Sequence, residues 1–205
     1  MRMLNVTEFD KFAREVFAPT YPVIAAQIKE KSGITGGSCL DIGCGGGYLS
    51  IALAEITDLD IYLLDKNAEM LKIAQKNVDA HGLGKRVRTL LGDVHEIPLA
   101  NQALNLVVSR GSMFLWENRQ GAFQEIYRVL SPGGVAYIGT GFGTAELQKQ
   151  ITAKMIEIDK DWAEKVKDVT GEKSVQIFQK VLEDAKIPEF KITQDHTGLW
   201  ISIWK

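Results

Sequence analysis

The sequence is poor in cysteine and has no long apolar run, and each shortage excludes a class of protein. Its two cysteines, Cys39 and Cys44, stand five positions apart, which fits neither a disulfide framework nor a zinc site. No apolar run is long enough to cross a membrane, and residues 1–17 carry acids and bases where a signal peptide would be apolar. We therefore expect a cytoplasmic protein with no membrane span and no metal site.

A strong excess of one charge sign is also missing. The chain has 24 Lys and Arg against 26 Asp and Glu, a formal net charge of -2, with both signs scattered along its length. Such a distribution offers no basic surface for a polyanion, so we expect no nucleic-acid partner. The 205 residues, 45% of them hydrophobic, suit a single domain with one sizeable core.

Apolar runs alternate along the chain with amphipathic stretches of helical spacing, which is typical of βα units. Asn67 predicts a helix N-cap, and Gly82 and Gly133 stand where helices are expected to end. Because each helix is long enough for a crossover, the pattern predicts an α/β fold with a doubly wound parallel sheet. The predicted strands are residues 38–42, 60–65, 87–91, 104–110 and 135–141.

The segment SCLDIGCGGGYLS, residues 38–50, places four glycines within five positions directly after the first predicted strand. In an open sheet of this kind a ligand lies beyond the carboxyl ends of the strands, where the next helix directs free backbone N–H groups at it. A dinucleotide fingerprint needs a further glycine at the sixth position, which is Tyr48 here. The spacing therefore disfavours a nicotinamide dinucleotide, and a tight turn without a ligand remains an alternative.

The run from Asp41 to Gly47 resembles the first motif of class I S-adenosylmethionine-dependent methyltransferases. Asp65, GDVHEIPL (residues 92–99) and RVLSPGGVAYI (residues 128–138) resemble later motifs of that family in the same order. The resemblance covers about residues 36–141 and implies S-adenosyl-L-methionine as the cofactor. It also implies a Rossmann-like sheet of seven strands in the order 3-2-1-4-5-7-6, with strand 7 antiparallel.

The resemblance also implies roles for single residues. Asp65 would accept hydrogen bonds from the ribose hydroxyls, Asp93 would accept one from the adenine amine, and the Val94 N–H would meet a ring nitrogen. The alternatives are that Asp65 caps the following helix and that Asp93 is only a turn residue. The expected cofactor-binding residues are Asp41, Gly43, Cys44, Gly45, Gly47, Asp65, Lys66, Gly92, Asp93, Val94, Ser109, Arg110 and Tyr21.

The end of the fourth predicted strand, residues 109–112, bears on the acceptor. Relatives that methylate adenine, cytosine N4 or glutamine carry Asn or Asp, then two prolines and an aromatic residue at this place, and this chain lacks that motif. The arsenic branch of the family uses additional cysteines, which this chain also lacks. Arg110 could pair with a carboxylate of the cofactor or of the substrate, or be a surface guanidinium. The expected substrate-binding residues are Phe17, Tyr21, Arg110 and Trp116.

No histidine stands where a general base would be needed, so no catalytic residue is assigned and a soft or already ionised acceptor is favoured. The resulting hypothesis is a methyltransferase that acts on a small-molecule acceptor. A nicotinamide-dependent oxidoreductase and a non-catalytic S-adenosylmethionine-binding module are the alternatives.

The expected domain has four segments. Residues 1–35 would form an aromatic-rich helical lid, or else a helix packed on the sheet, and residues 36–141 the cofactor core. Residues 142–170 would form one inserted helical cap, because apolar residues from Leu147 to Val166 recur at helical spacing. Residues 171–205 would form a final helix and strands 6 and 7, which turn at Thr197 and Gly198.

Overall fold

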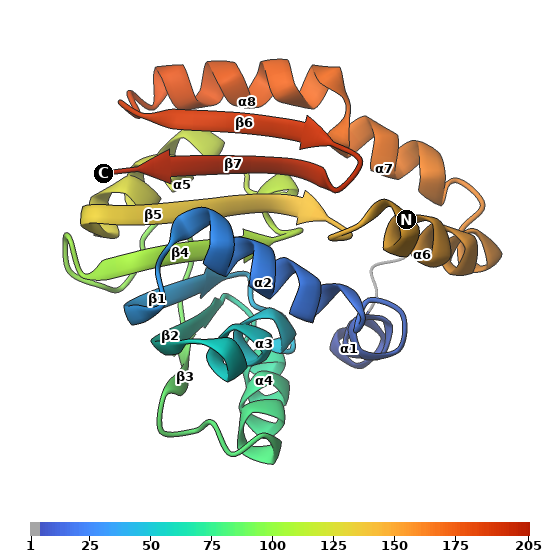
Figure 1. Ribbon diagram of the computed structural model, residues 1–205, viewed down its shortest axis with the longest axis horizontal. Helices are drawn as coiled ribbons and strands as arrows, with labels where there is room; N and C mark the ends of the chain where they lie inside the picture. The colour runs from blue at the N-terminus through green and yellow to red at the C-terminus, as the bar shows by residue number, and fades with distance from the viewer. Residues whose placement is uncertain (1–4) are drawn as a thin grey trace.

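The computed structural model describes residues 5–205 and contains one seven-stranded sheet between two layers of helices (Figure 1). The first four residues of the expected lid lie outside the described part. The strands are β1 (Gly36–Ile42), β2 (Asp58–Asp65), β3 (Val87–Leu91), β4 (Leu104–Arg110), β5 (Leu130–Gly141), β6 (Phe190–Asp195) and β7 (Gly198–Trp204). The helices are α1 (Val6–Glu15), α2 (Thr20–Ser32), α3 (Tyr48–Ile56), α4 (Ala68–Ala80), α5 (Arg119–Val129), α6 (Ala145–Ile158), α7 (Trp162–Thr170) and α8 (Glu172–Asp184), with a 3₁₀ turn η1 at Met113–Leu115.

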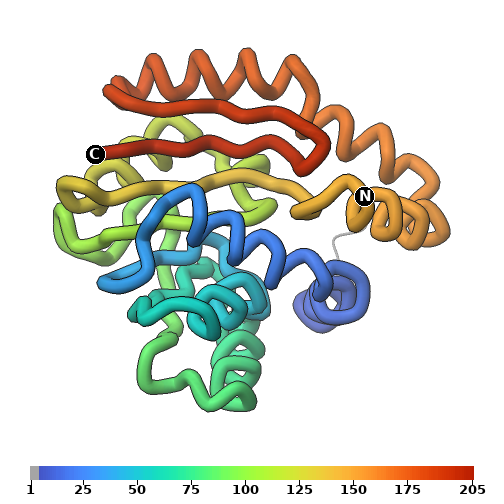
Figure 2. The backbone as a smooth tube through the Cα atoms, in the orientation of Figure 1, coloured from blue at the N-terminus to red at the C-terminus, as the bar shows by residue number. Residues whose placement is uncertain are grey.

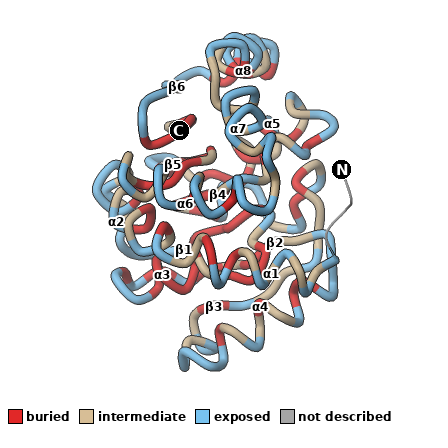
Figure 3. The backbone as a smooth tube through the Cα atoms, turned by 90° about the vertical axis from the view of Figure 1, so that its right-hand side faces the viewer, coloured by how far each residue is buried: buried red, intermediate tan, exposed pale blue. Residues whose placement is uncertain are grey.

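The strand order is β3-β2-β1-β4-β5-β7-β6, which confirms the predicted sheet. Strands β1 to β5 pair in parallel, and β7 is antiparallel to both β5 and β6. The carboxyl ends of the parallel strands therefore lie at one edge of the sheet. Helices α1 and α6 lie beyond that edge, which the chain trace and the view turned by 90° both show (Figures 2 and 3).

Side chains on the two faces of the sheet form two separate cores, as the alternation of a strand requires. On one face Ile61 and Leu63 of β2 pack with α2, α3 and α4. On the other face Leu64 packs with α5 and α8, whose Phe123 and Phe178 are fully buried. The two faces explain why the central strands read as continuous apolar runs, and Figure 3 shows much of the backbone near β1, β2 and β4 buried, whereas β6 at the edge of the sheet is exposed.

The fifth strand begins earlier than expected. Leu130 already pairs with Leu104 of β4, and regular pairing resumes at Val135 after an irregularity. Gly133 therefore lies inside β5 and does not end the preceding helix, which stops at Val129. The expectation for Gly82 is confirmed, because it follows the last turn of α4 with a left-handed φ of 69°.

The cap is two helices, so the prediction of one inserted helix is wrong. The chain breaks between α6 and α7, where Asp159 accepts hydrogen bonds from Asp161 N and Lys165 Nζ. The apolar stripe continues across the break, since Met155 and Trp162 belong to one cluster with Phe17. Ile158 leaves the stripe and is 57% exposed.

The N-terminal segment divides into two helices with different surroundings. Helix α2 packs on α3 and the sheet, with Ile24, Ala25 and Ile28 fully buried. It therefore follows the alternative of a helix packed on the sheet. Helix α1 begins with a capping box between Asn5 and Glu8 and lies over the edge of the sheet (Figure 1).

Within residues 5–205, no helix combines the length and the apolar character that crossing a membrane would require.

Phe123 anchors the core under α5, where its ring meets Trp116 and Phe178 edge to face at centroid distances of 5.6 and 6.2 Å. Phe123→Ala should lower the free energy of unfolding by about 3–5 kcal/mol, because it leaves a cavity that these rings cannot fill. Urea denaturation measures the change. Ile177→Ala, at an exposed position of α8, is the control and should change stability by less than about 0.5 kcal/mol. Equal effects of the two substitutions would contradict this account of the core.

Candidate functional site

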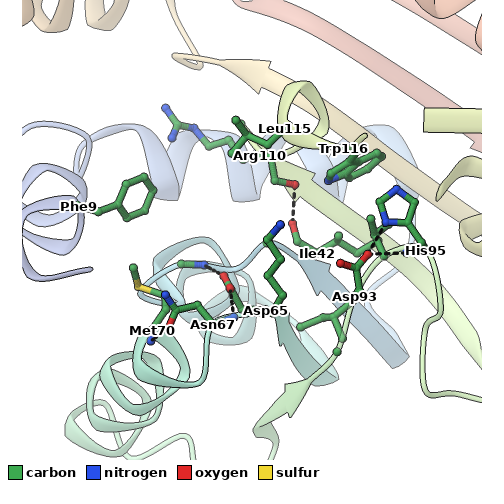
Figure 4. Close-up of a pocket in the computed structure, with 18 of the residues that line it drawn as sticks. Phe9, Ile42, Asp65, Asn67, Met70, Asp93, His95, Arg110, Leu115 and Trp116 are labelled. Atoms are coloured by element: carbon green, nitrogen blue, oxygen red, sulfur yellow. Dashed lines mark hydrogen bonds and ion pairs between the residues drawn. The ribbon is translucent and has the colours of Figure 1, made fainter. Parts of the chain in front are cut away.

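A cavity of about 390 Å³ opens at the edge where the parallel strands end (Figure 4). Its wall is built from the turns after β1, β2, β3 and β4, with α1 at one side. Many of the residues expected from the sequence line it together: Gly43, Gly45, Asp65, Lys66, Gly92, Asp93, Val94, Arg110 and Trp116. The fold thus brings motifs from four strands to one place.

Other expected residues lie behind this wall: Asp41, Cys44, Gly47, Ser109, Phe17 and Tyr21. Ser109 is fully buried, and its Oγ donates to Ile42 O at 2.8 Å, which ties the end of β4 to that of β1. Cys44 is partly buried, and burial raises the pKa of its thiol. These residues shape the turns and do not face the cavity.

The glycine turn supplies shape more than hydrogen-bond donors. Gly43 N and Cys44 N both donate to Leu64 O, and Gly45 N donates to Asp65 Oδ2 at 3.3 Å. Gly43 and Gly45 have φ angles of 66° and 55°, which side chains rarely adopt. A Cβ at Gly43 would also stand 2.5 Å from the Ser112 Cβ. Several backbone N–H groups of the turn therefore already have acceptors within the protein. In a phosphate-binding loop, such groups are free to bind the ligand.

Asp65 stands at the end of β2 with both carboxylate oxygens engaged by backbone N–H groups. Oδ1 accepts from Asn67 N at 2.9 Å, and Oδ2 accepts from Gly45 N. The cap of α4 is Asn67, whose Oδ1 accepts from Glu69 N and Met70 N, as expected for Asn67. The alternative that Asp65 caps this helix is therefore wrong, and its carboxylate joins β2 to the glycine turn at the cavity wall (Figure 4).

Asp93 is fixed by His95, a residue that was not among the expected site residues. Asp93 Oδ1 accepts from both the backbone N and the ring Nδ1 of His95. The ring Nε2 accepts from Asn118 N at 3.3 Å, which assigns the ring proton to Nδ1. The backbone hydrogen bond from His95 is the main cause that lowers the pKa of Asp93. Oδ2 has no hydrogen-bond donor among the described residues.

Arg110 ends β4 and reaches across to the end of β5. Its Nε and Nη2 both donate to Gly141 O, at 3.2 and 3.0 Å. The guanidinium lies 5.1 Å from the Phe17 ring centroid and 5.4 Å from that of Tyr21. Burial lowers the pKa of Arg110, and no carboxylate of residues 5–205 pairs with it. Phe17 and Tyr21 thus contact Arg110 from behind the cavity.

Helix α1 supplies the aromatic side chain that does face the cavity. Phe9 is 49% exposed and lines the wall, and its ring would meet a Cβ at Gly45 at 3.2 Å. Asp10 Oδ1 accepts from Tyr48 OH at 2.8 Å, which joins α1 to the start of α3. The cavity is thus covered from the N-terminal segment by Phe9, where the sequence suggested Phe17 and Tyr21.

The remaining lining residues were missed because nothing distinguishes them in the sequence from turn or core residues. They are Val6, Phe9, Ile42, Leu64, Asn67, Met70, His95, Gly111, Ser112, Leu115 and Glu117. A signal existed only for His95, which follows Asp93 by two positions, the spacing at which a side chain can bond back to an aspartate.

Asp41 is a buried carboxyl in β1, and its Oδ2 accepts from Ser50 Oγ at 2.7 Å. Burial raises the pKa of Asp41 to about 7, against the lowering effect of the Ser50 hydrogen bond. In residues 5–205 no three His, Cys, Asp or Glu side chains gather as metal ligands would.

The family model described as a methyltransferase domain matches residues 35–186. A crystal structure from Methanococcus maripaludis, provisionally assigned as an S-adenosyl-L-methionine-dependent methyltransferase, is 42% identical. The match covers 100% of this chain and 97% of that one, with a TM-score of 0.96.

Curated relatives are more distant. An arsenite methyltransferase of Halobacterium salinarum is 28% identical over 82% of this chain and 42% of its own length. An uncharacterised methyltransferase of Bacillus subtilis is 33% identical over 52% of this chain and 58% of its own length. The chain thus matches at most a little over half of each of these relatives.

The buried Asp41 should make stability depend on pH. Its pKa is about 7 in the folded protein and near 3.9 in an unfolded chain, so the folded state holds the proton more tightly. The stabilisation that proton binding by Asp41 gives the folded state is complete below pH 4 and is lost as pH rises to 7. As pH rises from 5 to 8, the free energy of unfolding of Asp41→Asn should increase relative to that of the wild type by about 2–3 kcal/mol. Urea denaturation at each pH measures the difference. The exposed Asp60→Asn is the control, and parallel curves for Asp41→Asn and the wild type would contradict the assignment.

Proposed function

The chain belongs to the family of S-adenosylmethionine-dependent methyltransferase domains, and from that premise we propose that it transfers a methyl group to a small-molecule acceptor. The observation that carries the proposal is the order of groups along the carboxyl edge of the sheet. Asp93 follows β3, Asp65 ends β2, the glycine turn follows β1 and Arg110 ends β4. Neighbouring strands lie about 4.8 Å apart, so these groups follow one extended line.

The residues present fit S-adenosylmethionine. The cavity of about 390 Å³ is within the usual range for a small ligand. Asp93 Oδ2 is open to a donor, and the Gly43 position has no room for a side chain. When bound, S-adenosylmethionine supplies a reactive methyl group on a positively charged sulfur.

We assign the residues of the chain the following roles toward this cofactor. Asp65 accepts the ribose hydroxyls, Asp93 Oδ2 accepts the adenine amine, and Val94 N meets a ring nitrogen. His95 positions Asp93, because it occupies Oδ1 and leaves Oδ2 for the ligand. The absence of side chains at Gly43 and Gly45 allows the ligand to approach the backbone closely.

Helix α1 and the turn after β4 exclude water from the reacting atoms. Phe9 and Leu115 both line the cavity and are 49% and 78% exposed. A bound ligand would therefore cover apolar surface of both side chains. Water exclusion strengthens the electrostatic interactions of a charged reacting group and prevents side reactions. Positioning and desolvation are the main contributions that this chain makes.

A small acceptor is supported by the modest size of the cavity and by the near balance of charge, which gives no sign of a basic surface for nucleic acid. Curated relatives include a demethylmenaquinone methyltransferase and sterol 24-C-methyltransferases. Arsenite is not supported as the acceptor here, because Cys39 is wholly buried in the core and Cys44 is the only other cysteine.

The nucleophile should need no strong general base. His95 is the histidine that lines the cavity, and both of its ring nitrogens are engaged, by Asp93 and Asn118. A thiolate, an enolate or an amine can accept a methyl group without such a base.

S-adenosylmethionine and S-adenosylhomocysteine should bind in the micromolar range, roughly -7 to -9 kcal/mol. Asp65→Ala should weaken both by about 1.5–3 kcal/mol, because two hydroxyls lose a charged acceptor. Asp65→Asn should lose less, since it keeps one acceptor oxygen. Calorimetry measures the affinities, and the exposed Asp60→Ala of the same strand is the control.

Several outcomes would contradict this assignment. Tight binding of NADH without binding of S-adenosylmethionine would favour the oxidoreductase, and an unchanged affinity with reduced stability would make Asp65 structural. Cofactor binding without formation of S-adenosylhomocysteine from any small acceptor would favour a non-catalytic binding module.

Helix α1 and the cap should become ordered when S-adenosylhomocysteine binds. Helix α1 joins the core through few polar contacts, and segments of this kind open most easily. Hydrogen exchange should therefore slow at residues 6–23 and 145–155, while β6, at the outer edge of the sheet and without a residue that lines the cavity, serves as the internal control. Slowing confined to residues 43–47 would show that α1 and the cap are scaffold and do not close.

A further inference from the structure

Arg110 is a cation without a counter-ion. Its Nε and Nη2 share one neutral acceptor, Gly141 O, and Nη1 has no acceptor among the described residues. An arginine keeps its charge at neutral pH, and a charge removed from water without a partner is costly. The side chain nevertheless lines the cavity, where a ligand can reach it.

The guanidinium is held in place before any ligand arrives. Phe17 and Tyr21 flank it with their rings, and Gly141 O fixes the angle of the fork. A long side chain that is already immobile loses little entropy when it binds a ligand. The arrangement therefore favours two parallel hydrogen bonds to a planar anion.

The surroundings of Arg110 are rich in donors and poor in acceptors. In residues 5–205, the buried side-chain polar atoms without a partner are two indole N–H groups, of Trp162 and Trp200. The Trp162 ring lies 6.2 Å from that of Phe17, and Trp200 Nε1 would stand 3.0 Å from a Cβ at Gly141. Both indoles thus contact the residues that hold Arg110. Asp10 and Asp41 act on Tyr21, but no carboxylate of residues 5–205 forms an ion pair with Arg110 itself, which leaves its charge for an anionic ligand.

The position of Arg110 separates it from the groups assigned to the nucleoside. Asp93 and Asp65 belong to the β3 and β2 side of the edge, whereas Arg110 contacts the end of β5 on the other side of β1. Figure 4 shows its guanidinium toward Phe9 and away from Asp93 and His95. Phe9 and Leu115 add apolar surface at the cavity wall.

We propose that Arg110 binds a carboxylate of the methyl acceptor, which is therefore a small organic acid with an apolar body. The inference rests on the proposed methyl transfer, because it places the nucleoside at the acidic end of the cavity. The bound carboxylate is an anchor and not the methylated atom, since pairing with arginine makes an oxygen a weaker nucleophile.

Matched ligands test the proposal. The probes are benzoate, phenylacetate and hexanoate, each against its uncharged primary amide, with S-adenosylhomocysteine at saturation. At least one carboxylate should bind the wild type ten-fold or more tightly than its amide. Arg110→Met should reduce that preference to less than two-fold, and Arg110→Lys should retain part of it.

Arg119→Met is the matched control. The Arg119 guanidinium also lies over a ring, 5.3 Å from the Phe178 centroid, and donates to the carbonyl of Phe114, but it does not line the cavity. Its substitution should leave the carboxylate preference intact. Thermal melting of each variant checks folding, and Arg110→Gln replaces Arg110→Met if the latter does not fold.

A second measurement separates the acceptor from the cofactor. Arg110→Met should bind S-adenosylhomocysteine within two-fold of the wild type. A ten-fold loss for S-adenosylhomocysteine, with unchanged binding of 5′-methylthioadenosine, would show that Arg110 holds the cofactor's own carboxylate and would overturn the proposal. A wild type that prefers no carboxylate over its amide would overturn it as well. If the carboxylate preference persists although no nucleoside binds, the proposed function fails and the anion site stands.

Discussion

The parallel pairing of β1 between β2 and β4 is the constraint on which the site depends. Because these strands run in one direction, each of their outgoing turns opens at the same edge of the sheet. The glycine turn, Asp65 and Arg110 are therefore neighbours although they are far apart in the sequence. The two helical layers must cover the faces of the sheet, which leaves this edge as the place where polar groups can meet a ligand.

Local signals were sufficient for most of the sheet and for the wall of the cavity. Strands β3 and β4 have the predicted bounds, because a buried strand leaves a clear apolar run. The start of β5 could not be predicted, since Leu130 joins the sheet only through its partner Leu104. Proline and glycines at 132–134 resemble a turn in sequence, and the pairing across β4 overrides that local preference.

The residues that hold the site groups were harder to predict than the groups themselves. His95 and Phe9 acquire their roles from contacts across the fold, with Asn118 and with Gly45. Phe17 and Tyr21 were selected for their aromatic character, but their rings lie against Arg110 and do not line the cavity. A high content of aromatic residues identifies a segment that packs against the rest of the protein. Only the tertiary contacts decide which of its rings faces the ligand.

The third hydrophobic cluster, which joins Phe17 to the helices after β5, is separate from the two cores of the sheet. Substitutions inside it would change the surroundings of Arg110, where we propose that the acceptor binds, without disturbing the packing that positions Asp65 and Asp93. Such a division allows evolution to exchange acceptors while the nucleoside half of the protein stays under unchanged selection.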